Sequence, residues 1–256
     1  MTLDTSTLSK KTVVAMWSGP RNISTAMMRA FENRTDTAVW DEPFYAHYLA
    51  TTGLTHPMYQ DVIEAGETDA EAVIARCLRT PEQPNRHGTM PTLWFQKHMT
   101  VHMQPAISLE WTAEIRNFFL IRRPEAVLAS YHDRRANPSA ADVGFERQVE
   151  LFDTITRLRG ISPPVVDSDA MLAAPEKIMP ALCDALSIPF DPAMLSWPPG
   201  VRADDGVWAA HWYASVETSR GFAPSRAPRA LPDHLSSLAH SCRPHYEALA
   251  EHAIRE

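Results

Sequence analysis

The feature that most constrains the fold is a repeated alternation between short, almost wholly apolar runs and longer amphipathic runs. The apolar runs, rich in β-branched and aromatic residues, are predicted strands at 11–17, 37–43, 92–99, 116–123 and 163–169. The amphipathic runs are predicted helices at 24–34, 69–78, 124–135, 145–160 and 175–188. Apolar strands that alternate with helices are typical of a parallel sheet covered on both faces. We therefore expect an α/β fold of three layers.

The remaining segments indicate one domain over residues 1–256 with several irregular excursions. Residues 44–66 and 80–91 carry no clear periodicity, and we expect loops there. Prolines are dense over 196–233, which predicts a loop-rich segment, followed by a final helix over 234–254.

Composition excludes several classes of protein. The net charge is −7 with no run of like charge, so broad binding to nucleic acid or to an anionic membrane is not expected. The N-terminal MTLDTSTLSK lacks a signal-peptide core, and no segment approaches the ~20 apolar residues that cross a bilayer. We expect a cytoplasmic protein.

The three cysteines lie far apart and outside any CxxC pattern, so neither a disulfide framework nor a metal site is expected.

The turn SGPRNISTA, at residues 18–26, follows the first predicted strand and opens the first predicted helix. A helix N-terminus presents unpaired N–H groups that bind phosphate or sulfate. Gly19 permits a tight turn, and Arg21 adds a fixed positive charge. Ser24 and Thr25 add hydroxyl donors, whereas the GxxxxGK[ST] pattern of ordinary ATPases would require Gly-Lys in their place. The alternative is a common Ser/Thr helix cap beside an exposed arginine.

A second basic motif follows the fourth predicted strand. In IRRPEAVLASYH, Arg122 ends the strand and Ser130 lies two helical turns further along. The carboxyl ends of parallel strands meet at one rim of the sheet, so Arg122 and Arg21 are expected on the same rim. On its own, this motif would indicate only the solvent-exposed N-terminus of a helix. Together, the two motifs predict a ligand with two separated phosphates.

At these two motifs the chain resembles the sulfotransferases that use 3′-phosphoadenosine 5′-phosphosulfate (PAPS), in a branch often described as branched-chain-aminotransferase-associated. PRNISTA lies on that family's PKSGTTW loop and RRPEAVLAS on its RNPKDVAVS motif, without gaps. The resemblance implies a P-loop NTPase-like fold of sulfotransferase type, PAPS as cosubstrate and no metal. It also implies residues that bind the nucleotide, namely Gly19, Arg21, Asn22, Ser24, Thr25, Arg122 and Ser130.

The resemblance further assigns the chemistry. WFQKHM resembles the family's KTH strand end, which implies His98 as the base and Lys97 beside it, while Arg21 would contact the transferred sulfuryl group. Strand alternation points the Lys97 and His98 side chains to opposite faces, so only one of them is expected to face the site squarely. Glu42 is an alternative base.

Two departures from the family pattern weaken the match locally. Ala26 replaces the tryptophan that stacks on adenine in many relatives. The C-terminal phosphate loop has only a loose counterpart in TSRGFAP, which implies Arg220 and Gly221 as nucleotide ligands.

The acceptor is expected to be a small molecule with a hydroxyl or an amine. WDEPF follows the second predicted strand and places Glu42, Phe44 and Tyr45 as candidate substrate-binding residues. Further aromatic residues in predicted loops, either pocket lining or satellite core, are Tyr48, Trp208, Trp212 and Tyr213. His98 and His102 have the spacing of helical zinc ligands but lack a third ligand.

Two other functions stay open on the sequence alone. One is a nucleotide-binding homologue that has lost transfer activity. The other is an atypical P-loop phosphotransferase of the kinase kind. The sequence does not indicate an oligomeric state.

Overall fold

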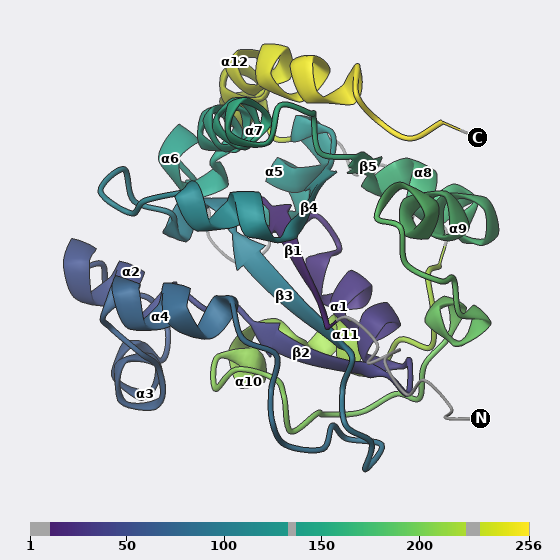
Figure 1. The fold of residues 1–256 in the computed structure, drawn as a ribbon. Coiled ribbons are helices and arrows are strands. Elements are labelled where there is room, and N and C mark those ends of the chain that lie inside the picture. Colours follow the sequence, from purple (N-terminus) through teal and green to yellow (C-terminus); the bar gives the residue numbers. More distant parts are fainter. Residues whose placement is uncertain (1–10, 133–136, 224–230, 256) are drawn as a thin grey trace, which may run out of the picture.

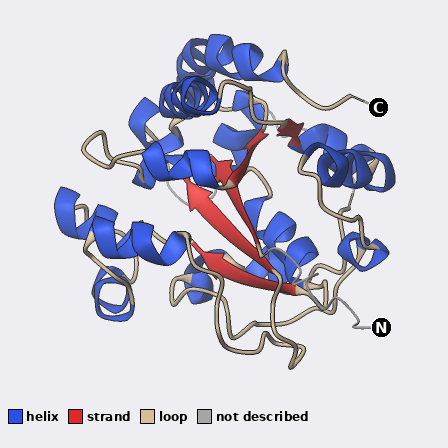
Figure 2. Cartoon of the chain, in the orientation of Figure 1, coloured by secondary structure: helices blue, strands red, loops and turns tan. Residues whose placement is uncertain are grey.

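The computed structural model describes residues 11–132, 137–223 and 231–255, and it contains a parallel sheet of five strands (Figures 1 and 2). The strands are β1 (Thr12–Ser18), β2 (Thr37–Asp41), β3 (Leu93–Met99), β4 (Arg116–Ile121) and β5 (Val165–Asp167). Their order in the sheet is β2-β3-β1-β4-β5, and every pairing is parallel. The predicted α/β class and the five predicted strands are confirmed.

Helices surround this sheet. They are α1 (Ser24–Glu32), α2 (Tyr45–Thr52), α3 (Tyr59–Ala65), α4 (Ala70–Cys77), α5 (Pro124–His132), α6 (Ala140–Val143), α7 (Phe145–Arg159), α8 (Ser168–Ala173), α9 (Pro175–Ala185), α10 (Ala209–Trp212), α11 (Ala214–Glu217) and α12 (Asp233–Ala250). The described residues also form short 3-10 helices, namely η1 (Thr100–His102), η2 (Glu110–Glu114) and η3 (Pro192–Leu195).

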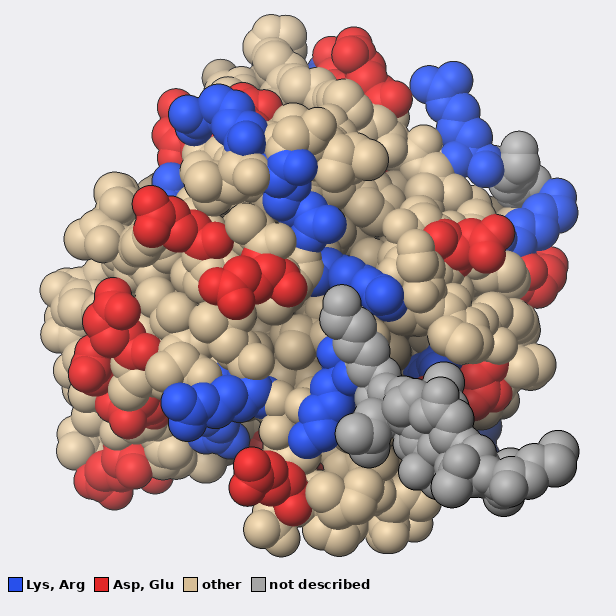
Figure 3. Space-filling view, in the orientation of Figure 1, with Lys and Arg blue, Asp and Glu red and all other residues tan. Residues whose placement is uncertain are grey.

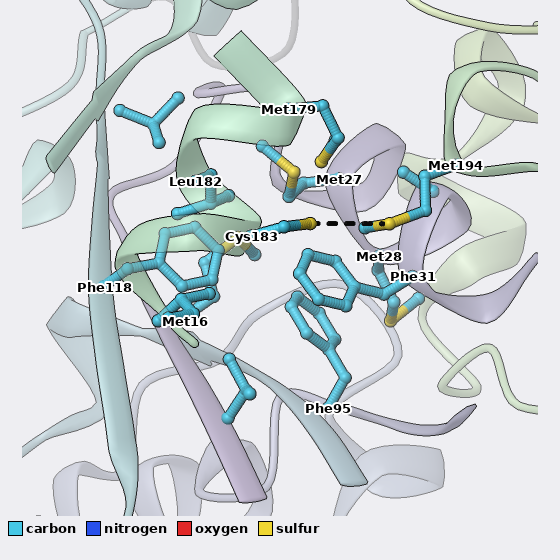
Figure 4. Packing of buried hydrophobic residues seen from close by; sticks show 14 of the residues in the cluster. Met16, Met27, Met28, Phe31, Phe95, Phe118, Met179, Leu182, Cys183 and Met194 are labelled. Carbon is cyan, nitrogen blue, oxygen red and sulfur yellow. Dashed lines mark hydrogen bonds between the residues drawn. The ribbon is translucent and has the colours of Figure 1, made fainter. Parts of the chain in front are cut away.

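One face of the sheet packs against α1, α8 and α9. Val14, Phe95 and Phe118 come from three neighbouring strands and pack against apolar side chains of these helices. Methionines and Cys183 fill the remaining space, as Figure 4 shows. The flexible thioether of methionine suits such irregular gaps.

The opposite face packs against α4, α7 and α12. In Figure 1, α4 lies to the left of the strands, and α7 and α12 lie above them. The side chains of Trp17 on β1 and Phe119 on β4 point to this face. Along each strand, such residues alternate with the residues that point to the first face. This alternation is the two-residue period of a strand, and it explains why the strands carry apolar side chains on both faces along most of their length.

The order of the strands creates a crevice beside β1. From β1 the chain moves outward to β2, whereas from β4 it moves outward in the opposite direction to β5. The loops that follow β1 and β4 therefore diverge, and in open α/β sheets ligands bind in the space between such loops. Arg21 lies in the first of these loops and Arg122 begins the second.

Three predictions about the elements need correction. Residues 44–66 are not irregular, because α2 and α3 occupy most of them. The segment 196–233 contains the short helices α10 and α11, and part of it, at 224–230, lies outside the described residues. The final helix ends at Ala250 rather than residue 254. The predicted N-terminal features at 1–10 and the end of the helix predicted over 124–135 also lie outside the described residues.

Acidic and basic side chains both appear on the face shown in Figure 3, separated by large areas of uncharged surface. None of the helices in the described part of the chain combines the length and the apolar character that crossing a membrane requires.

We predict that Phe31→Ala strongly destabilises the fold. The Phe31 ring is fully buried and stacks on Phe95 with a centroid separation of 4.1 Å. Its removal should lower the free energy of unfolding by about 3–5 kcal/mol, as for other buried phenylalanines. Urea denaturation measures this loss. The control is Leu158→Ala, because Leu158 is an exposed residue of α7. An equal loss in both variants would contradict this account of the core.

Candidate active site

A cavity of about 340 Å³ opens at the carboxyl ends of β1, β2 and β3, beside the loop that follows β4. Residues from distant parts of the chain line it. They include Arg21, Ser24, Thr25, Ala26, Glu42, Tyr45, Tyr48, His56, Lys97, Met99, Val101, His102, Arg122, Ser130, Tyr131, Asp142, Trp208, Trp212, Tyr213 and Val216. The cavity therefore unites both basic motifs of the sequence with the candidate acceptor residues.

The loop after β1 is shaped for an anion. Arg21 and Ile23 adopt left-handed backbone conformations, with φ of 62° and 57°, so the chain turns sharply into α1. No side chain caps the N-terminus of α1. The first N–H groups of a helix have no partner within it, and here they lie beside the hydroxyl groups of Ser24 and Thr25. In other proteins, helix N-termini with unpaired N–H groups are typical binding sites for phosphate or sulfate.

The second basic motif contacts the first directly. Arg21 Nε donates a hydrogen bond to Ser130 Oγ over 2.9 Å. Arg122 Nη1 donates to the backbone oxygen of Arg21 over 2.8 Å. Two motifs separated by about a hundred residues thus form one wall of the cavity.

Arg122 is a cation with too little compensating charge. Burial lowers the pKa of its guanidinium, and Asp169 and Asp167 offset this only in part. Its Nε is buried and has no hydrogen-bond partner. A buried donor without a partner is costly, so an anionic ligand would supply the missing acceptor.

Gly19 and Asn22 support the loop and do not line the cavity. Asn22 Nδ2 donates to the backbone oxygen of Leu120 over 3.0 Å, which ties the loop to β4. A side chain at Gly19 would approach the backbone oxygen of Val143 to 3.3 Å, so the position favours glycine for close packing.

Lys97 lies at the opposite wall, where its buried side chain is the centre of a polar cluster. Its Nζ donates to Asp41 Oδ1 over 2.7 Å and to Glu42 Oε1 over 2.6 Å. It also donates to the Tyr213 hydroxyl over 2.7 Å, and that hydroxyl donates to Asp41 Oδ2 over 2.6 Å. The two carboxylates hold the pKa of Lys97 well above its usual range despite burial.

Glu42 is the group of this cluster that can exchange a proton near neutral pH. Burial raises its pKa to about 7, although Lys97 acts to lower the pKa, and Asp41 adds a smaller rise. The residue adopts a left-handed conformation with φ of 43°, which turns the chain at the end of β2 and brings the side chain to the cavity. Lys97 holds one carboxylate oxygen, and the other is 3.9 Å from His102 Nδ1.

The structure places His98 outside the cavity. Its ring stacks on Trp17 at 4.5 Å and also packs against Phe44 and Trp111, on the face covered by α4 and α7. Burial lowers its pKa to about 3. The prediction of His98 as the base therefore lacks support from this geometry, because strand alternation sends Lys97 to the cavity and His98 into the core.

The candidate acceptor residues divide in the same way. Tyr45 and Glu42 line the cavity, whereas Phe44 is 1% exposed and packs with His98 in the core. The His102 ring stacks between Tyr45 and Tyr48, with centroid separations of 4.5 Å and 4.9 Å. Sequence reasoning considered His102 only as a metal ligand and did not anticipate this position. Over the described residues, no three His, Cys, Asp or Glu side chains gather as a metal site.

Arg220 and Gly221 do not line the cavity in the described structure, although Ser219 does. Gly221 pairs with Ser196 in an isolated bridge, and a side chain there would approach the backbone oxygen of Leu195 to 2.8 Å. The Arg220 side chain is exposed. Their role as nucleotide ligands stays a prediction.

We predict that His98 makes the fold sensitive to acid. Its folded pKa of about 3 lies below the ordinary value of 6.5, so the unfolded chain binds the proton more readily. Stability is therefore complete above pH 6.5 and falls as the pH drops towards 3. Between about pH 7.5 and pH 5 the loss from this residue should be about 2 kcal/mol.

The comparison of wild type with His98→Phe isolates this effect. Urea denaturation gives the free energy of unfolding of each protein at pH 7.5 and at pH 5, and hence the loss that each protein suffers on acidification. Any change in packing caused by the substitution affects a protein equally at both pH values. The difference between the two losses therefore reports the protonation of His98 alone. Equal losses would show that His98 is accessible to protons in the folded protein.

Comparison with known proteins agrees with this architecture. A family model described as a sulfotransferase domain matches residues 12–253. Branched-chain-amino-acid aminotransferase-like protein 1 of Arabidopsis thaliana is 32% identical over 247 residues, which are 96% of this chain and 43% of that protein. Protein 2 of the same name and organism is 32% identical over 242 residues, 94% of this chain and 42% of that protein. The chain thus spans less than half the length of these relatives.

Two solved structures share the fold. The sulfotransferase domain from the curacin biosynthetic pathway has a TM-score of 0.51 at 18% identity, covering 90% of this chain and 96% of that one. The sulfotransferase from Alicyclobacillus acidocaldarius has a TM-score of 0.52 at 11% identity, covering 94% and 96%. The match of the family model over nearly the whole chain shows that this protein belongs to the sulfotransferase domain family.

Proposed function

We propose that this chain transfers a sulfuryl group from PAPS to a hydroxyl or an amine of a small-molecule acceptor. One observation carries the proposal: two arginine-bearing loops and a carboxylate with a pKa near neutrality face the same cavity. Phosphate binding at one wall and proton acceptance at the other are the two requirements of this reaction.

The nucleotide would lie along the wall formed by the loops after β1 and β4. Arg21, Ser24 and Thr25, with the N-terminus of α1, are placed to hold the 5′-phosphosulfate. Arg122 and Ser130 are placed to hold the 3′-phosphate, and the buried, unpartnered Nε of Arg122 supports this assignment. When the nucleotide is bound, it supplies the sulfuryl group for transfer.

Glu42 is the proposed base. Its pKa of about 7 leaves it largely ionised at slightly alkaline pH, where it can accept the acceptor's proton. Lys97 holds Glu42 Oε1 over 2.6 Å and so orients the carboxylate. The arginine fork of Arg21 is positioned to stabilise negative charge that develops on the sulfuryl oxygens. We thus place Lys97 as a positioning residue and leave His98 out of the mechanism.

Calorimetry separates this function from the two alternatives. Our proposal requires that 3′-phosphoadenosine 5′-phosphate binds more tightly than ATP with magnesium. Tight binding of ATP with indifference to the 3′-phosphate would instead favour a phosphotransferase. A screen for transfer of labelled sulfate to mixed metabolites then distinguishes an enzyme from a nucleotide-binding homologue without activity.

We predict that Arg122→Ala selectively weakens recognition of the 3′-phosphate. Affinity for 3′-phosphoadenosine 5′-phosphate should fall about 10- to 100-fold, since a charge-assisted contact contributes about 1.5–3 kcal/mol. Affinity for adenosine 5′-phosphosulfate, which lacks the 3′-phosphate, should change little. The matched control is Arg123→Ala, because Arg123 is half exposed and pairs with Asp169. Equal losses for both nucleotides would place Arg122 elsewhere in the site.

We predict that kcat/KM rises with pH through about 7, because Glu42 must lose its proton to act and its pKa is raised to about 7. Glu42→Gln should remove this limb of the pH profile and lower kcat about 10²- to 10⁴-fold, the usual contribution of a general base. Glu64→Gln, at an exposed position, serves as the control. A profile of unchanged shape in Glu42→Gln would rule out Glu42 as the base.

A further inference from the structure

His102 combines three properties that call for a ligand. His102 lines the cavity, and its side chain is only 6% exposed. Its Nδ1 is buried without a hydrogen-bond partner. The ring itself is rigidly held, because Tyr45 lies nearly parallel to it at an angle of 3°. Buried polar groups in native proteins are rarely left unpaired. A partner supplied from the cavity would satisfy this nitrogen.

The distance between His102 and Glu42 indicates what that partner is. His102 Nδ1 and Glu42 Oε2 are 3.9 Å apart, too far for a direct hydrogen bond. One oxygen or nitrogen atom placed about 2.8 Å from each would bridge the two groups. The other oxygen of Glu42 is held by Lys97, so Oε2 is the atom left for this bridge.

We propose that the acceptor's reacting hydroxyl binds between Glu42 Oε2 and His102 Nδ1, with the Nδ1–H donating to its oxygen and Glu42 accepting its proton. This inference rests on the proposed function and adds His102 to it as a second catalytic residue.

The charge state of His102 agrees with a donor role. Burial lowers its pKa well below the usual range, and His56, Lys97 and His98 lower it further. Glu42, Tyr45 and Tyr48 are the other ionisable groups that face the ring. A neutral imidazole keeps one N–H and does not compete with Glu42 for the proton. The environment thus separates the pKa of Glu42 from that of His102, which suits Glu42 as the proton acceptor and His102 as the hydrogen-bond donor.

The proposed step balances. The acceptor oxygen forms a bond to sulfur while the bond between sulfur and the 5′-phosphate oxygen breaks, and the electron pair of that bond stays on the phosphate. The acceptor's proton moves to Glu42 Oε2 and later passes to solvent. His102 keeps its proton throughout and fixes the direction from which the oxygen approaches.

Two substitutions separate hydrogen bonding from packing. His102→Phe keeps a flat ring between Tyr45 and Tyr48 but removes the donor. His102→Asn shortens the side chain but places an amide N–H near the position of Nδ1. His240→Phe, at an exposed position on α12, is the control.

The first measurement uses 2-naphthol as the probe hydroxyl, because its own pKa lies well above 7 and its ionisation does not overlap that of Glu42. Calorimetry gives its affinity for the complex with 3′-phosphoadenosine 5′-phosphate, and absorbance gives its sulfation by PAPS. We expect His102→Phe to weaken probe binding about tenfold and to lower kcat/KM 10- to 100-fold, while His102→Asn recovers most of both. Affinity for the nucleotide alone should stay within about twofold, which also shows that each variant is folded.

The second measurement is the pH profile, which should keep its limb near 7 in both variants. Wild-type behaviour of His102→Phe would overturn the proposal and reduce His102 to a packing residue. Loss of the limb in both variants would also overturn it, since His102 would then be the base. Failure of the wild type to bind 2-naphthol in the presence of nucleotide counts against this hydroxyl site alone. Failure to bind 3′-phosphoadenosine 5′-phosphate counts against the proposed function itself.

Discussion

The neutralisation of Lys97 is the interaction on which the rest of the site depends. A fully buried ammonium group is tolerated only when it is paired and hydrogen-bonded. Here Asp41, Glu42 and the Tyr213 hydroxyl supply all three partners. These bonds connect β2, β3 and the C-terminal segment that carries α10 and α11. The same contacts that compensate one charge therefore hold one wall of the cavity over the sheet.

The two ends of the cavity have opposite electrostatic character. At one end the guanidinium of Arg122 is partly buried with a lowered pKa and an unpartnered Nε, so that end lacks negative charge. At the other end the carboxylates of Asp41 and Glu42 share one ammonium, and burial raises the pKa of Glu42 to about 7. An anionic donor complements the first end, and a neutral acceptor that gives up a proton complements the second. This asymmetry sets the direction in which the two substrates would lie.

Much of the fold followed from the sequence, whereas the site followed only in part. The five strands were predictable because each is an apolar run bounded by turn residues. The meeting of the two arginine-bearing loops at one rim was predictable from their place after parallel strands. Helices α2 and α3 were missed, because they pack in a small apolar cluster that includes Tyr45, Val62 and Trp208 instead of presenting a long periodic stripe. His98 was predicted as the base because an imidazole at a strand end can accept a proton at neutral pH, but its ring belongs to the core beside Trp17.

By itself, the sequence determined the α/β class, the family, the two arginine loops and the fact that Lys97 and His98 face opposite ways. A period of two residues along a strand fixes the last of these without any coordinates. Only the tertiary structure decided which of the two faces the cavity, because that depends on which helices cover each side of the sheet. It alone also brought His102 within 3.9 Å of Glu42. That distance joins a turn after β3 to the end of β2, and the pairing of these strands, rather than any local pattern, sets it.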